Sequence, residues 1–245
     1  MTRLKDHTLQ FGQSIAIPQI KASSNFKNAL RIQESFTASI EKRVLVWMAQ
    51  RMPRWINSDH LTFLGLSSMF FAGASYAWAR GHRAGFWLAI FFLMLNWFGD
   101  SLDGTLARVR NCQRPRYGFY VDHIVDAFGA AFLMIGLACS GCLHWSVAIG
   151  MLIVFLIFSI EVHLATYTLG KFQLSYWKFG PTEIRILLAI GSVRLFLDPW
   201  AHIAGRQYLI FDIGGVVAIF GMSAMVLVST IRHTLQLYRE ERIAR

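Results

Sequence analysis

Residues 100–126 read DSLDGTLARVRNCQRPRYGFYVDHIVD and lie between long apolar segments. This segment carries four aspartates, at positions Asp100, Asp103, Asp122 and Asp126. A carboxylate near a bilayer core is costly, so it persists mainly where it faces a protein interior or a water-filled cavity and has a function. We therefore expect the chemistry of the chain in this segment.

The spacing of the aspartates predicts two helix ends that each present a pair of carboxylates. Asp100 and Asp103 are three residues apart and Asp122 and Asp126 four apart, so each pair shares one helix face. Residues 111–116 read as the turn between the two helices. Carboxylate oxygens suit a hard cation such as Mg²⁺ or Mn²⁺ better than they suit zinc. Since four negative charges at close range repel one another, one or two divalent ions would complete the site.

The composition predicts a helical membrane protein. The chain has 245 residues, of which 55% are hydrophobic and only 16% charged, whereas a soluble domain carries about a quarter charged residues. Several apolar runs approach the roughly 20 residues that span a bilayer. These runs are continuous rather than alternating, which favours helices over a barrel. We expect an all-α fold, a six-transmembrane-helix bundle with an N-terminal interfacial amphipathic helix.

The predicted domain boundaries follow from these runs. They are a cytoplasmic N-terminal tail at 1–37, the interfacial amphipathic helix at 38–56, a six-helix transmembrane catalytic domain at 57–232, and a basic cytoplasmic tail at 233–245. In the amphipathic segment, Val44, Trp47 and Met48 share one face, whereas Glu41 and Lys42 lie mostly elsewhere. The alternative for this segment is an ordinary packed helix. The six expected spans are 60–78, 84–98 with a helical continuation to 108, 118–138, 145–169, 181–197 and 208–230.

The basic residues predict the orientation in the membrane. The net charge is +10, which could suggest nucleic acid, but the lysines and arginines gather in the loops and tails of one predicted side. This asymmetry is a topology signal, so we expect no nucleic-acid partner. It places both termini and the aspartates in the cytoplasm. The three cysteines do not form a disulfide framework.

The aspartate segment resembles the signature of the CDP-alcohol phosphotransferase family. The matching pattern is Asp100-x2-Asp103-Gly104-x2-Ala107-Arg108-x9-Gly118-x3-Asp122-x3-Asp126, in which all eight fixed positions are present. Nine residues separate Arg108 from Gly118, where eight are more usual in the family. The resemblance implies a phospholipid-biosynthetic enzyme that joins a CDP-linked donor to an alcohol acceptor and releases CMP. It also implies a membrane-embedded site, two divalent ions and a homodimer.

The resemblance further implies a role for each matched residue. Asp100, Asp103 and Asp122 would bind metal, and Asp126 would bind metal and also act as the general base on the acceptor hydroxyl. The expected nucleotide-binding residues are Asp59, Thr62, Gly104, Ala107, Arg108 and Gly118. The first two belong to a Pro-Asn/Asp-x-x-Thr element, which here begins with serine at position 58 instead of proline.

The sequence gives a less specific signal for the residues that would bind the second substrate. Glu161, Glu183 and Arg185 lie in apolar surroundings near the expected depth of the aspartates, and we expect them to line the pocket of the second substrate. The alternative is a structural Glu–Arg ion pair between helices. His123, directly after Asp122, resembles the branch that uses a CDP-aminoalcohol (CDP-choline or CDP-ethanolamine) with diacylglycerol. The competing branch uses CDP-diacylglycerol with a small polar alcohol.

Two other functional classes also account for part of the sequence. A divalent-cation transporter would use the aspartates as its ion site, but it would not explain Gly104, Ala107, Arg108 and Gly118 at fixed spacing. A transporter also favours a site near the bilayer midplane rather than at helix ends. A catalytically silent scaffold would not need an intact set of four aspartates.

Overall fold

The computed structural model of the chain describes residues 30–32, 38–169, 171–173, 181–203 and 205–241. Most of the predicted tail at 1–37 and the end of the predicted tail at 233–245 lie outside these residues. The helices of the described part are α1 (Ala38–Arg51), α2 (Ser58–Ala79), α3 (Ala84–Val109), α4 (Pro115–Ser140), α5 (Trp145–Leu169), α6 (Pro181–Leu197) and α7 (Ile210–Glu240). Its short strands are β1 (Leu30–Ile32), β2 (Lys171–Gln173), β3 (Trp200–Ile203) and β4 (Arg206–Leu209).

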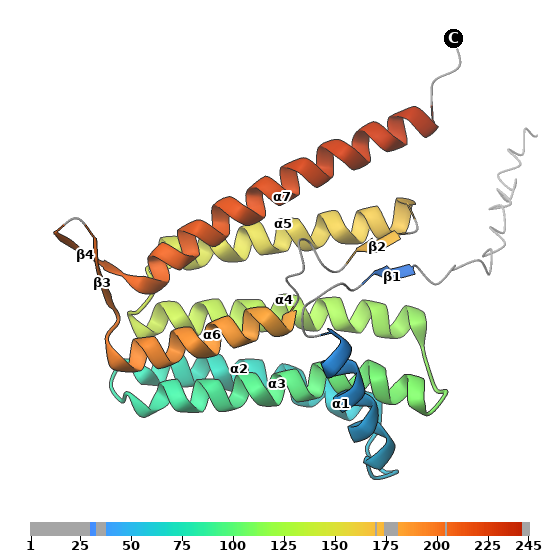
Figure 1. Cartoon of the computed structure of the whole chain (residues 1–245), viewed down its shortest axis with the longest axis horizontal. Coiled ribbons are helices and arrows are strands. Elements are labelled where there is room, and N and C mark those ends of the chain that lie inside the picture. The colour runs from blue at the N-terminus through green and yellow to red at the C-terminus, as the bar shows by residue number, and fades with distance from the viewer. Residues whose placement is uncertain (1–29, 33–37, 170, 174–180, 204, 242–245) are drawn as a thin grey trace, which may run out of the picture.

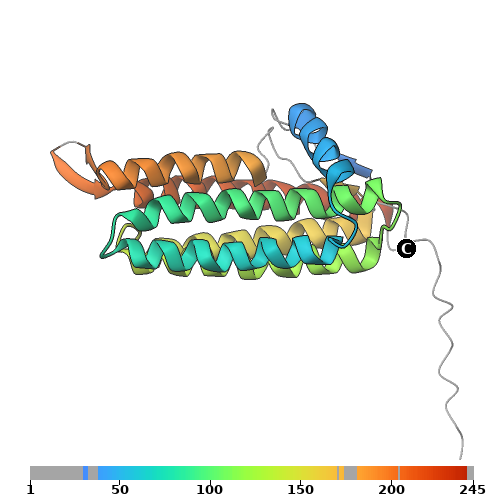
Figure 2. The same ribbon diagram turned by 90° about the horizontal axis from the view of Figure 1, so that it is seen from below.

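Helices α2 to α6 run side by side as a bundle, and α7 leaves it at an angle (Figure 1, Figure 2). Helix α2 packs against both α3 and α4, α6 packs against α3, and α5 joins α4 to α7. Consecutive helices alternate in direction, so α2 and α4 start at one end of the bundle, and the shorter α6 starts partway along it with its first turn toward the same end (Figure 1). Helix α1 and the C-terminal end of α7 lie at this end as well, which we call the α1 end. The β3–β4 hairpin marks the opposite hairpin end.

Helix α1 crosses the end of the bundle and packs on α3 (Figure 2). Its residues Leu45 and Ala49 form a small buried cluster with Leu61, Leu102 and Leu106 of α2 and α3. Val44 and Trp47 of α1 remain exposed. The location of α1 at a membrane interface stays a prediction, because these exposed apolar side chains are compatible with it without requiring it.

Helix α2 lies so close to its neighbours that side chains are excluded at the crossings. A Cβ atom on Gly136 of α4 would lie 2.1 Å from the carbonyl oxygen of Gly73 in α2. A Cβ atom on Gly99 of α3 would lie 2.6 Å from the carbonyl oxygen of Leu61 in α2. Small residues allow backbones in membranes to approach in this way. These contacts set the separation of α3 and α4, the two helices that carry the aspartates.

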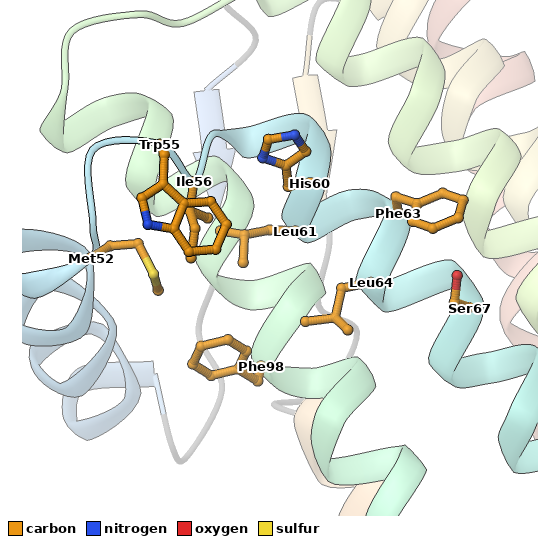
Figure 3. A pocket seen from close by; sticks show the side chains of 9 residues that line it. All are labelled: Met52, Trp55, Ile56, His60, Leu61, Phe63, Leu64, Ser67 and Phe98. Atoms are coloured by element: carbon orange, nitrogen blue, oxygen red, sulfur yellow. The ribbon is translucent and has the colours of Figure 1, made fainter.

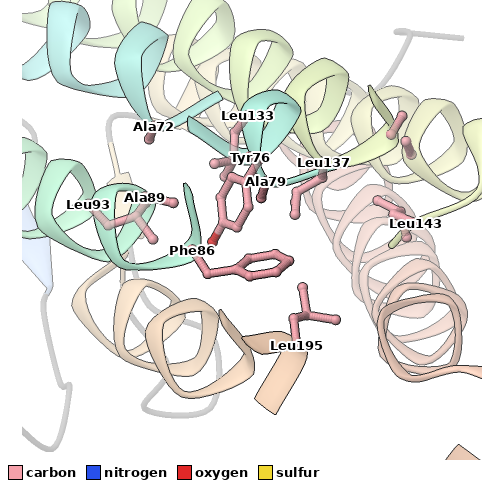
Figure 4. Packing of buried hydrophobic residues seen from close by; sticks show 12 residues of the cluster. Ala72, Tyr76, Ala79, Phe86, Ala89, Leu93, Leu133, Leu137, Leu143 and Leu195 are labelled. Carbon is pink, nitrogen blue, oxygen red and sulfur yellow. The ribbon is translucent and has the colours of Figure 1, made fainter. Parts of the chain in front are cut away.

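The main core lies between α2, α3, α4 and α6, nearer the hairpin end. Figure 4 shows Tyr76 among Phe86, Leu133 and Leu195, which come from α3, α4 and α6. Tyr76 is fully buried, and its hydroxyl shares a hydrogen bond of 2.5 Å with the hydroxyl of Ser192 on α6. A buried phenol needs such a partner, so this contact ties α6 to the bundle.

Four of the described helices, α3, α4, α5 and α7, are long and apolar enough to cross a membrane. The chain is therefore an integral membrane protein. The six predicted spans also include α2 and α6, and their crossing stays a prediction. Helix α6 has 17 residues, fewer than the roughly 20 that span the hydrocarbon core. Helix α2 has 22 residues but includes polar positions such as Ser67, Ser68 and Ser75.

The predicted helix limits lie within a few residues of the observed ones, except at the ends of α1 and α7. Helix α1 ends at Arg51, before the predicted limit at 56. Helix α7 continues to Glu240 instead of ending near Thr230, because residues 231–240 contain neither glycine nor proline to stop it. The strands were not expected in an all-α fold. Strands β1 and β2 pair in parallel, and β3 and β4 pair as an antiparallel hairpin with Gly205 at a positive φ of 77°.

Candidate active site

The four aspartates lie on two helices at the α1 end of the bundle. Asp100 and Asp103 are in the last third of α3, and Asp122 and Asp126 are in the first half of α4. Residues 110–114 connect the two helices. Because α2 packs against both, its first turns lie beside the carboxylates.

Asp103 is the most deeply held of the carboxylates whose contacts the structure gives. Its side chain is buried, and its Oδ2 accepts a hydrogen bond of 2.6 Å from the hydroxyl of Thr62 on α2. The other carboxylate oxygen accepts from the backbone N–H of Gly104. The hydroxyl of Ser58 donates to the backbone carbonyl of Asp103 at 2.9 Å. The start of α2 therefore fixes both the main chain and the side chain of Asp103.

The start of α2 is itself well defined. Asn57 is the N-cap: its side chain accepts from the N–H of His60 at 3.2 Å, and the His60 ring accepts from the N–H of Asn57 at 3.3 Å. This reciprocal pair satisfies two N–H groups that a helix start leaves free. Asp59 forms an ion pair with Arg114 of the α3–α4 connection. The cap orients α2 so that Thr62 faces Asp103, while Asp59 anchors the connecting loop.

Arg185 of α6 brings a positive charge to the aspartates. Its Nη2 lies 2.6 Å from Oδ2 of Asp100, and its Nε donates to Oδ1 of Asn96 at 2.8 Å. Asn96 in turn donates to the backbone carbonyl of Gly65 on α2 at 2.9 Å. Arg185 is therefore held in a fixed orientation by two partners on α3, one of which is anchored to α2.

The four carboxylates lie within electrostatic range of one another. Asp126 interacts with the charges of Asp100, Asp103, Asp122 and Arg185, and Asp103 interacts with those of Asp100 and Asp122. An all-carboxylate oxygen set has the donor chemistry that Mg²⁺ or Mn²⁺ requires. No three histidine, cysteine, aspartate or glutamate side chains of the described residues converge into a metal cage. Thr62 and Arg185 instead hold oxygens of Asp103 and Asp100.

Two of the predicted nucleotide positions, Gly104 on α3 and Gly118 on α4, have room for a larger group beside them. A Cβ atom on Gly118 would meet nothing within 4 Å, and one on Gly104 would meet only the end of the Arg108 side chain, at 3.5 Å. Arg108 is exposed and donates to the hydroxyl of Thr105 at 2.9 Å. Ala107, the small residue before it, is half-buried. Room and a positive charge therefore lie next to the aspartates.

The three residues predicted for the acceptor pocket have different surroundings. Arg185 contacts Asp100, as described above. Glu161 of α5 forms a 2.6 Å contact with the ring of His233 on α7, and its second oxygen is buried without a hydrogen-bond partner among the described residues. Glu183 is half-buried in the first turn of α6. Arg185 thus forms an ion pair with Asp100, a partner that was not expected from the sequence.

His123 packs against the neighbouring helix. Its ring lies 4.0 Å from the ring of His163 on α5, measured between centroids, and one ring nitrogen lies 2.6 Å from the backbone carbonyl of Phe119. Phe119 also contacts His163, at 5.8 Å between centroids. His163 is thus packed against two aromatic rings of α4.

A separate pocket of about 340 Å³ lies between the α1–α2 connection, α2 and α3 (Figure 3). Its walls are mostly apolar, and Trp55, Leu64 and Phe98 are among the side chains that line it. None of the predicted site residues lines this pocket. It is therefore distinct from the aspartate site.

Several residues of the site were not expected from the sequence. Asn96 and Ser58 orient Arg185 and Asp103 from outside the aspartate segment, and Glu41 of α1 bonds to α3 and α6. The sequence could have indicated a role for Asn96, because a polar amide within an apolar segment needs a hydrogen-bond partner. The sequence could not have indicated a role for Glu41, because a glutamate on an amphipathic helix is normally solvated.

One comparison with known proteins identifies a family for this chain. The family model described as CDP-alcohol phosphatidyltransferase matches residues 55–232, which include α2, the four aspartates and Arg185. A comparison with curated proteins found no match. Members of the matched family transfer phospholipid head groups from CDP-alcohols and use divalent metal ions. The chain therefore belongs to the CDP-alcohol phosphatidyltransferase family and is an integral membrane transferase of phospholipid biosynthesis.

Proposed function

We propose that this chain transfers a substituted phosphate group from a CDP-alcohol to an acceptor alcohol and releases CMP. The donor is CDP-diacylglycerol or a CDP-aminoalcohol, and one of the two substrates is a lipid. The observation that carries the proposal is the meeting of four carboxylates with Arg185 and Thr62 at one end of a membrane bundle. The family match over residues 55–232 supports the same reaction.

We assign the metal-binding role to Asp100, Asp103, Asp122 and Asp126. Their oxygen donors suit two divalent ions, Mg²⁺ or Mn²⁺. Bound ions would supply charge neutralisation at the pyrophosphate and at the departing CMP. Arg185 offsets part of the negative charge of the carboxylates at Asp100 and keeps that side chain oriented.

Asp126 is the proposed general base. An alcohol is a weak nucleophile until a carboxylate accepts its proton. In the proposed step, the acceptor oxygen forms a bond to the phosphorus of the transferred group while the bond from that phosphorus to the CMP oxygen breaks. The hydroxyl proton passes to the Asp126 carboxylate, and CMP leaves with the electron pair of the broken bond.

The nucleotide would occupy the open space beside Gly104, Ala107 and Gly118. Arg108 is exposed at the edge of this space, where it could pair with a phosphate. Thr62 acts through Asp103, and Asp59 orders the loop through Arg114. We keep Glu161, Glu183 and Arg185 as proposed residues of the acceptor side, with Arg185 nearest the aspartates.

The topology we propose has six spans, with the site and both termini on the cytoplasmic side. Helix α1 and the end of α7 lie at the same end of the bundle as the aspartates, which agrees with an even number of crossings (Figure 1). The excess of lysine and arginine at that end favours the cytoplasm. We also expect a homodimer, on the strength of the family alone.

The test is CMP release by the purified protein in vesicles, with Mg²⁺ or Mn²⁺ and a panel of CDP-alcohols and acceptors. Asp126→Asn should lower kcat by at least about 100-fold, the usual contribution of a general base, while metal and nucleotide binding are largely kept. Asp198→Asn, at the hairpin end, is the matched control and should behave as wild type. Metal flux into liposomes with no CMP from any pair would instead support a transporter.

A further inference from the structure

Glu41 of α1 is the acceptor of three hydrogen bonds from two other helices. Its Oε1 accepts from the indole Nε1 of Trp97 at 2.9 Å and from the hydroxyl of Ser101 at 3.3 Å, both on α3. The same oxygen accepts from the hydroxyl of Thr182 on α6 at 2.8 Å. The side chain of Glu41 is half-buried. One carboxylate oxygen thus joins α1, α3 and α6.

The donors of this network lie directly beside the proposed catalytic groups. Ser101 follows Asp100 in the sequence of α3. Thr182 precedes Arg185 by three residues, so the two side chains are neighbours on the surface of α6. Glu41 therefore connects the parts of α3 and α6 that carry the Asp100–Arg185 ion pair.

We propose that Glu41 is a positioning residue of the transferase, which sets Arg185 against Asp100 by holding the first turn of α6 to α3. This role rests on the proposed function. Thr182 lies in the first turn of α6, three residues before Arg185, so a hydrogen bond from its hydroxyl is an anchor for this turn near the site. The hydroxyl of Thr182 and the carboxylate of Glu41 supply that anchor.

The three hydrogen bonds to Glu41 require an acceptor at position 41 but no negative charge. All three donors are neutral: one indole N–H and two hydroxyl groups. The side-chain carbonyl of glutamine can accept the same bonds with nearly the same reach. A role of Glu41 as a charge, for example toward Arg185, would instead be lost in glutamine. The Glu41→Gln substitution therefore distinguishes the two explanations, because it keeps the acceptor and removes the charge.

The experiment compares three variants of residues on α1 by CMP release in vesicles, normalised to folded protein. Glu41→Ala should lower kcat/KM about tenfold or more, since it removes an acceptor whose bonds hold the site. Glu41→Gln should stay within about threefold of wild type, because it keeps the acceptor. Lys42→Ala, an exposed neighbour on the same helix, should match wild type.

A double-mutant cycle tests whether Glu41 acts through Arg185. In an Arg185→Lys background, adding Glu41→Ala should cost less than about twofold, because coupled residues are non-additive. A Glu41→Ala variant with wild-type kcat and KM, a Glu41→Gln variant as impaired as Glu41→Ala, or fully additive losses would each overturn the positioning role. If the wild type itself releases no CMP with any pair, the proposed function fails and the positioning role fails with it.

Discussion

Arg185 has two contacts that a single point charge could not make together. Its Nη2 donates to Asp100 and its Nε donates to Asn96. Because these are two separate donors of one planar group, the two hydrogen bonds fix the orientation of the guanidinium. Arginine presents several donors in a fixed fork, whereas lysine presents one compact ammonium. The orientation of Arg185, as well as its charge, therefore belongs to the site.

Replacing Arg185 by lysine should lower kcat/KM by at least about tenfold, because the ammonium cannot bond Asp100 and Asn96 at once. We expect the KM for the acceptor to rise more than the KM for the CDP-linked donor. Both constants follow from CMP release with one substrate varied at a time. Arg83→Lys, on an exposed residue at the hairpin end, is the control. Unchanged constants in folded Arg185→Lys protein would remove Arg185 from the acceptor side.

Gly118 tests the proposed nucleotide space. A Cβ atom there meets nothing within 4 Å, so Gly118→Ala should fold with wild-type stability or slightly above it, because alanine favours a helix over glycine. Its methyl group would enter the space assigned to the nucleotide, and crowding of this kind should raise the KM for the donor by about tenfold. Thermal unfolding and donor titration measure the two effects separately. Gly221→Ala, also in open space but on α7, should leave the donor KM unchanged and unfold at or slightly above the wild-type midpoint. A donor KM equal to that of wild type would place the nucleotide elsewhere.

The sequence predicted which helices carry the aspartates but not which residues contact them, for a physical reason, and the metal-binding role of the aspartates stays a prediction. Asp100, Asp103, Asp122 and Asp126 are spaced by three or four residues within helices, so local periodicity places each pair on one face. Thr62 is 41 residues from Asp103, and Arg185 is 85 residues from Asp100. Contacts at such separations depend on how helices pack, which periodicity does not determine.

At the scale of the elements, the helices were predictable where a turn signal bounded an apolar run. Pro181 opens α6, and Gly141, with a φ of 78°, ends α4. Loss of hydropathy after Thr230 was a poor guide to the end of α7, because backbone hydrogen bonding continues until a residue stops it. The β3–β4 hairpin could have been suspected from Gly205, which lies between two segments that contain the aromatic residues Trp200 and Tyr208. Each of these segments is too short to stand out as a strand in the sequence.

The crossing of α2 and α4 gives a prediction for helix packing. In Gly136→Ala, the added Cβ would lie 2.1 Å from a backbone oxygen of Gly73, a clash that no side-chain rotation can relieve. The helices must separate, which should cost about 1–3 kcal/mol of stability. The midpoint of thermal unfolding in detergent measures the loss.

Gly214→Ala on α7 is the control for this experiment, since its Cβ meets nothing within 4 Å. That variant should unfold at or slightly above the wild-type midpoint, because alanine favours a helix over glycine. Equal midpoints for Gly136→Ala and Gly214→Ala would mean that α2 and α4 do not approach each other closely at Gly136 and Gly73.

At the scale of the whole molecule, the alternating direction of the helices explains why the aspartates lie at one end of the bundle. The aspartates, α1 and the end of α7 share one end of the bundle, while the hairpin lies at the other (Figure 1). Helices α3, α4, α5 and α7 are long and apolar enough to span. Helices α2 and α6 pack along α3 in the same bundle. The membrane topology therefore depends on whether these two helices also cross.

Three single-cysteine proteins would decide the number of spans. Cys112 is exposed in the α3–α4 connection, and Lys42→Cys and His202→Cys place a thiol on exposed positions of α1 and of the hairpin. Each is made with the other native cysteines changed to serine. With six spans, a membrane-impermeant maleimide should label positions 42 and 112 from one side of sealed vesicles and position 202 from the other. If α6 does not cross, position 202 will label together with 112. If α2 does not cross, position 42 will label opposite 112.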